Sequence, residues 1–144
     1  MKLRTYTTFE ADFPDDAEFT ENGDIKHPGG LKIARVLGEL LESRGLKVSA
    51  PKQHSFYGWA FVVRDHNYSF WFLLQFPGPW LLLSQNRTSW IQRLFRSKPL
   101  SQHRRTLEIL NESLRQDGRF RNIQWYHKQY YEQGKGRLSG EKIP

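Results

Sequence analysis

The 144-residue chain contains no cysteine, and this absence excludes several kinds of site at once. Disulfide frameworks, thiolate zinc sites, iron–sulfur clusters and cysteine nucleophiles all depend on that residue. The chain also has no apolar run near the roughly 18 residues that a membrane-spanning helix needs. Its N-terminal residues lack the apolar stretch of a signal peptide. We therefore expect a cytoplasmic protein that does not partner a membrane.

Recognisable catalytic motifs are missing as well. The sequence has no Gly-x-Ser-x-Gly elbow, no phosphate-binding loop and no dinucleotide-binding pattern. Its five histidines stand far apart, and the one adjacent acid–histidine pair, Asp65 and His66, falls in an expected hairpin turn. The sequence thus predicts no catalytic residue, no cofactor and no metal site. A site assembled only in three dimensions, or an anion bound at Gly29 and Gly30 before a helix, stays open.

Basic residues are absent from one further stretch, residues 5–25, although the whole chain carries a net charge of +7. Seven acids lie there, whereas residues 26–144 hold 20 basic and 8 acidic residues, a balance of +12. Proline and glycine punctuate the segment, so we expect an acidic loop over residues 10–30. Such a loop is either a solvated surface or a contact for a cationic partner.

The residues that are present predict a single α+β domain over residues 1–131, followed by a flexible tail over 132–144. Residues 2–9 contain a β-favouring mixture and indicate a short first strand. Apolar residues at helical spacing then predict a helix over 31–44, which Gly45 ends. The fold class is therefore an antiparallel sheet of about four to five strands, with one helix before it and helices after it.

Aromatic residues concentrate in the expected sheet, a meander of about four strands over residues 46–84. Its clearest part is a hairpin formed by residues 56–64 and 68–76. Alternation in the second of these strands places Phe70 and its neighbours at even positions on one face and Trp71 on the other. Both faces are apolar, so we expect this strand to be central and at least partly covered on each side.

A short helix near residues 90–95, a longer helix over 100–116 and a strand over 120–126 complete the expected fold. Residues 87–121, which include these elements, carry nine Lys or Arg against three acids. Cations interleaved with aromatic residues are typical of proteins that grip phosphates and bases. A nucleic-acid-binding domain is therefore the alternative function, with candidate contacts Arg93, Arg96, Lys98, Arg104 and Arg105.

Four short motifs resemble those of a family of small bacterial α+β proteins of uncharacterised activity. They are Pro28-Gly29-Gly30 before the first helix, Tyr57-Gly58-Trp59, Phe70-Trp71 with Leu74-Gln75, and Ile123-Gln124-Trp125. The resemblance covers most of residues 9–126 and implies a fold. It implies no activity, because the shared residues are mainly glycines and aromatics. In outline, such small cysteine-free domains are also similar to the immunity proteins of bacterial toxin systems.

The leading interpretation is a non-catalytic module that binds and neutralises a partner protein, foremost as a toxin immunity protein. An acidic segment fits a basic cleft by charge complementarity, and an exposed aromatic residue anchors such a contact. The expected partner-binding residues are Asp12, Asp15, Asp16, Glu18, Glu21, Asp24 and Trp80. Because the segment is expected to be solvated, charge reversal of Asp15 and Asp16 is expected to leave the fold intact.

Overall fold

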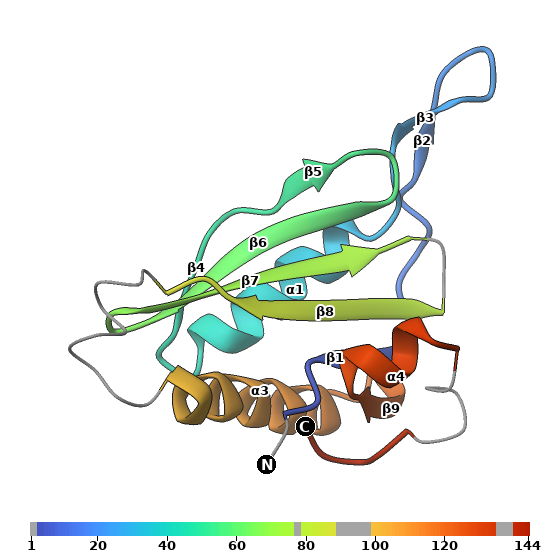
Figure 1. The fold of residues 1–144 in the computed structure, drawn as a ribbon. Helices are drawn as coiled ribbons and strands as arrows, with labels where there is room; N and C mark the ends of the chain where they lie inside the picture. The colour runs from blue at the N-terminus through green and yellow to red at the C-terminus, as the bar shows by residue number, and fades with distance from the viewer. Residues whose placement is uncertain (1–2, 77–78, 89–98, 135–139) are drawn as a thin grey trace.

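The computed structural model describes residues 3–76, 79–88, 99–134 and 140–144, and it confirms the α+β class. A seven-stranded antiparallel sheet carries helices α1 (Leu31–Glu42) and α3 (Pro99–Gln116) on one face, here called the helix face (Figure 1). The opposite side is called the open face. Helix α4 (Lys128–Glu132) follows the last strand and packs its Tyr131 against Tyr6 on the open face. Within the described residues, no helix is long and apolar enough to cross a membrane.

The strands follow the order β4, β6, β7, β8, β1 and β9, and β5 pairs with β6 beside β4. Their bounds are Tyr6–Ala11 for β1, Lys47–Val48 for β4, Lys52–His54 for β5, Gly58–Asp65 for β6, Tyr68–Gln75 for β7, Trp80–Asn86 for β8 and Phe120–Tyr126 for β9. The sheet thus exceeds the predicted four to five strands. Pro51, which has no N–H to donate, divides the stretch after α1 into two short strands.

The hydrophobic core lies between the sheet and the two longer helices. Phe70, Phe72 and Leu74 of β7 are completely buried and share one apolar cluster with both helices, as their alternation predicts. The helices contribute the seams that their spacing predicts, namely Ile33, Leu37 and Leu41 from α1 and Leu107, Leu110 and Leu114 from α3. Burial on this face fixes the register, so every odd-numbered residue of β7 is directed to the open face.

A carboxylate from the acidic segment caps the N-terminus of helix α1. The Asp16 side chain accepts hydrogen bonds from the backbone N–H groups of Gly30 (2.7 Å) and Lys32 (2.8 Å). It thereby satisfies two of the amides that a helix start leaves without a partner. The end of the helix agrees with the sequence, because Gly45 has the left-handed φ of 91° that stops a helix.

The sequence predicts that the acidic segment is a loop, but the structure shows that it also contains a small hairpin. Strands β2 (Glu18–Phe19) and β3 (Ile25–His27) pair antiparallel and project from one end of the molecule (Figure 1). Thr20 holds the connection, since its backbone N–H donates to the Asp24 carbonyl and its hydroxyl accepts the Asp24 N–H. The hairpin is too short for hydrophobic alternation to reveal it.

Residues 140–144 are tied to the sheet, whereas the sequence predicts a flexible tail over 132–144. Glu141 exchanges both backbone hydrogen bonds with Trp125 of β9, at 2.7 and 2.9 Å. The Arg115 guanidinium donates to the Lys142 carbonyl (2.6 Å), and Pro144 is buried. The short helix predicted near residues 90–95 lies outside the described residues.

Candidate functional site

A groove on the open face brings together basic residues that lie far apart in the sequence. It has a volume of about 480 Å³ and runs over β4, β5, β6 and β7. Lys47, Lys52 and Arg64 line it, and Trp71 lies at its side, with Ala60 and Val62 as apolar floor. We call this site the basic groove. Each member reaches the open face because its strand buries the neighbouring residues on the helix face.

The strand register sets the backbone positions of three basic residues in one row across the sheet. Lys47 pairs directly with Arg64, and Arg64 pairs with Ser69 on the next strand. Arg87 follows β8, and its backbone N–H donates to the Ser69 carbonyl (2.8 Å), so the backbone of a further basic residue lies at the end of the row. Like charges directly opposite one another weaken strand pairing. An anion bound between them removes that repulsion.

Trp71 occupies the next row and is held by two neighbours. The Arg87 guanidinium lies 4.6 Å from the centroid of its ring, in cation–π contact. The His54 ring meets it edge-on, with centroids 5.5 Å apart and an interplanar angle of 69°. Trp71 is only half-buried, unlike Phe70 and Phe72 beside it. The indole is therefore a fixed, partly accessible aromatic surface among cations.

No acidic side chain neutralises these cations within the part of the chain that the structure describes. The salt bridges found there involve other basic residues, including Arg44, Arg105, Arg119 and Arg121. Lys47, Lys52 and Arg64 are all exposed, and the one side-chain hydrogen bond found for the Arg87 guanidinium in the described part of the chain goes to the neutral Gln85 side chain (3.3 Å). The groove therefore carries a local excess of positive charge.

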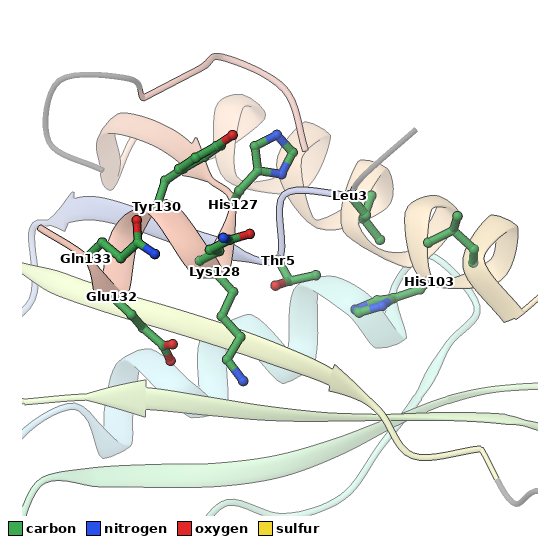
Figure 2. Close-up of a pocket in the computed structure, with 10 residues that line it drawn as sticks. Leu3, Thr5, His103, His127, Lys128, Tyr130, Glu132 and Gln133 are labelled. Carbon is green, nitrogen blue, oxygen red and sulfur yellow. The ribbon is translucent and has the colours of Figure 1, made fainter. Parts of the chain in front are cut away.

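A second cavity, of about 660 Å³, lies between the start of β1, helix α3 and helix α4 (Figure 2). Leu3 and His103 border it on one side, and Lys128, Tyr130 and Glu132 of α4 on the other (Figure 2). Two of its lining side chains, Glu132 and His103, are hydrogen-bonded within the fold, whereas the buried Nδ1 atom of His127 has no hydrogen-bond partner among the described residues. The Tyr6 hydroxyl donates to Glu132 (2.9 Å), and burial together with this carboxylate raises the pKa of Tyr6 to about 12.

His103, at the wall of this cavity, forms the one serine–histidine contact among the described residues. Its Nε2 lies 2.8 Å from the Ser84 hydroxyl oxygen, and its ring stacks on Phe70 at 4.9 Å. Burial lowers the pKa of His103 to about 4, so the imidazole is neutral near pH 7. Ser84 is itself buried and does not line the cavity, and no described carboxylate contacts the imidazole. The pair lacks the exposed nucleophile and the orienting acid of a hydrolytic triad.

Metal binding receives no support from the described residues, since no group of three or more His, Asp or Glu side chains gathers among them. The one adjacent acid–histidine pair has a structural role instead. His66 takes a left-handed φ of 56° in the β6–β7 turn, and the buried Asp65 pairs with Arg105 of α3.

The acids predicted to bind a partner divide into two groups. Asp16 caps α1, and Asp12 bonds to Arg121 (2.7 Å), so both are engaged in the fold. Asp15 accepts only the nearby Ala17 N–H. The exposed acids of the projecting hairpin and its loop are Glu18, Glu21 and Asp24. Charge reversal of Asp15 and Asp16 is expected to leave the fold intact because the segment is solvated, and this premise is wrong for Asp16.

The other residues predicted to contact a partner or nucleic acid differ in their exposure and in their bonding partners. Trp80 is half-buried and packs against Gly30 and Phe76, so it is not the exposed aromatic anchor that the sequence predicts. Phe19 of β2, with 56% of its surface exposed, is an exposed aromatic residue beside these acids. Arg105 is engaged by Asp65, and Arg104 is half-buried on α3. Three further predicted basic contacts, Arg93, Arg96 and Lys98, lie outside the described residues.

Sequence reasoning missed all of the residues that form the basic groove. One signal was available, because the hairpin register that pairs Asp65 with Tyr68 also sets Arg64 and Trp71 on one face. No such signal in the sequence indicates Lys47 or Lys52, since β4 and β5 are short edge strands whose pairing depends on the tertiary fold.

Comparison of the chain with protein-family models, with curated proteins and with solved structures finds no match. The functional argument therefore rests on the geometry of the described residues.

Proposed function

We propose that the protein binds nucleic acid through the basic groove. The observation that carries this proposal is the row in which Lys47 directly faces Arg64, next to the half-buried Trp71, in a groove that no described acidic residue lines. Phosphates release condensed counterions when lysine and arginine neutralise them, which makes such a row a favourable contact for a polyanion.

Protection of the sheet edge explains only part of this pattern. Lysines on edge strands discourage pairing with other chains, and Lys47 and Lys52 both lie on such strands. Arg64 belongs to the inner strand β6, however, and Arg87 directly follows β8, the fourth strand counted from that edge. Edge protection requires neither of them, and it gives no reason for an accessible tryptophan. Recognition of an anionic polymer accounts for all of these positions.

The test is the binding of fluorescently labelled oligonucleotides of about 12 nucleotides, followed by anisotropy at several salt concentrations. We expect the double variant Lys52→Gln/Arg64→Gln to lower affinity and to reduce the log–log salt slope by about 1.4 for a single strand. The matched control is Lys128→Gln/Lys142→Gln, which removes the same charge from exposed positions near the opposite edge of the sheet. Equal losses in both variants, or no binding at low salt, would refute the proposal.

The projecting hairpin favours a second candidate function, binding and neutralisation of a cationic partner protein, as an immunity protein does. Phe19 is exposed there beside Glu18, while Glu21 and Asp24 lie in the adjoining loop. Rim charges of this kind mainly accelerate association, and an aromatic anchor slows release. Capture from the source organism should identify the partner. Phe19→Ala should then raise the dissociation rate, and Glu21→Lys/Asp24→Lys should lower the association rate; unchanged rates in both would exclude the hairpin.

A further inference from the structure

The basic groove has a shape and an aromatic content that distinguish between forms of nucleic acid. A duplex offers an outer surface of phosphates, and its bases are stacked inside. Single strands can turn their bases outward onto aromatic side chains while their phosphates follow a positive groove. Trp71 lies at the wall of a concave site and not on a protruding element, so only a base that leaves its own stack reaches it.

The two rows of the open face match the two parts of a nucleotide. Lys47, Arg64 and the backbone position of Arg87 form the cationic row. Trp71 belongs to the row that begins at Val62, two residues along the strands, or about 7 Å away. One row therefore suits phosphates and the other suits a base.

Neighbouring contacts hold the indole ready for stacking. His54 fixes one edge of the ring, and the planar Arg87 guanidinium covers a face at 4.6 Å. The Arg87 side chain is exposed and has no acidic partner among the described residues, so it can exchange the indole for a phosphate. In the free protein, the guanidinium thus occupies the place of a flat ligand on the ring.

We infer that the ligand is a single strand and that one of its bases stacks on Trp71, a specificity that rests on the proposed function of the groove. Stacking is indifferent to base identity because every base has a π-face. The strand is therefore recognised by charge and by its unpaired state, with little sequence preference.

The experiment compares Trp71→Leu, Trp71→Phe and Tyr130→Leu, each against a labelled single strand of about 12 nucleotides and the duplex of the same sequence. Tyr130 is an exposed aromatic residue of α4 outside the groove and serves as the control. We expect wild-type protein to prefer the single strand. Trp71→Leu should weaken that binding at least about fivefold, with an unchanged salt slope, and Trp71→Phe should retain most of it.

The outcomes separate the inference from the function on which it depends. Equal affinity for strand and duplex, or full affinity in Trp71→Leu, overturns stacking even where Lys52→Gln/Arg64→Gln still weakens binding. Absence of binding to both nucleic acids overturns the proposed function itself. Circular dichroism identifies any variant that fails to fold. If Trp71→Leu does so, the wild-type affinities for strand and duplex decide the question, because equal affinity overturns stacking.

Discussion

At the scale of single residues, His103 shows how burial converts a titratable side chain into a structural one. Only 5% of its surface is exposed, between Phe70 and the Ser84 hydroxyl. Burial penalises the charged imidazolium and lowers the pKa of His103 to about 4, against 6.5 in an unfolded chain. Protonation therefore favours the unfolded state.

This shift predicts the pH dependence of stability. The contribution of His103 is fully present above pH 6.5, falls as pH decreases from 6.5 towards 4, and changes no further below pH 4. Between about pH 7 and pH 5 the loss amounts to roughly 2 kcal/mol. Urea unfolding at those two pH values measures it. His103→Gln should be less stable at neutral pH but should lose about 2 kcal/mol less on acidification; an identical loss would mean that other groups cause it.

At the scale of secondary structure, the sequence predicted the elements that depend on local signals. Helix α1 follows from its apolar spacing and Gly45, and the β6–β7 hairpin follows from alternation around a short turn. The antiparallel pairing of β1 with β8 and β9 joins segments more than 70 residues apart, which no local pattern reveals. The cap that Asp16 forms on α1 was missed because a tertiary contact positions it, and the β2–β3 hairpin was missed because its strands are too short to show alternation.

The cap on α1 gives a prediction at this scale. Asp16→Ala removes the carboxylate that accepts two backbone N–H hydrogen bonds at the helix start, and it should lower the free energy of unfolding by about 1–3 kcal/mol. Asp15→Ala is the matched control, because the Asp15 side chain accepts only the exposed Ala17 N–H, and it should cost less than about 0.5 kcal/mol. Thermal and urea unfolding measure both. Equal stability of the two variants would remove Asp16 from the cap.

At the scale of the whole molecule, opposite charges occupy neighbouring surfaces. Gln53 of β5 connects them, since its amide donates to the Lys26 carbonyl of the hairpin and its oxygen lies 2.6 Å from the His27 Nδ1. Lys52, the residue before it, lines the basic groove. The acids of the hairpin loop therefore act on any anion that approaches the groove, over a range that salt controls.

This arrangement predicts that Glu21→Gln/Asp24→Gln accelerates association with a single strand at about 10 mM salt, where the Debye length is about 30 Å. At about 150 mM, where it is near 8 Å, the difference from wild type should vanish. Stopped-flow association at the two salt concentrations tests this. Both side chains are exposed, so the melting temperature should not change. An acceleration of the same size at high salt would show that the loop blocks the groove by contact instead.

The pairing of Glu141 with Trp125 has a consequence for measurements of motion. The Trp125 amide donates to the Glu141 carbonyl at 2.7 Å and not to β1, although its side chain is completely buried. Its hydrogen exchange therefore reports detachment of residues 140–144, whereas amides between β1 and β9 report opening of the sheet. A single nuclear magnetic resonance signal can thus separate the lifetime of the C-terminal segment from that of the fold beneath it.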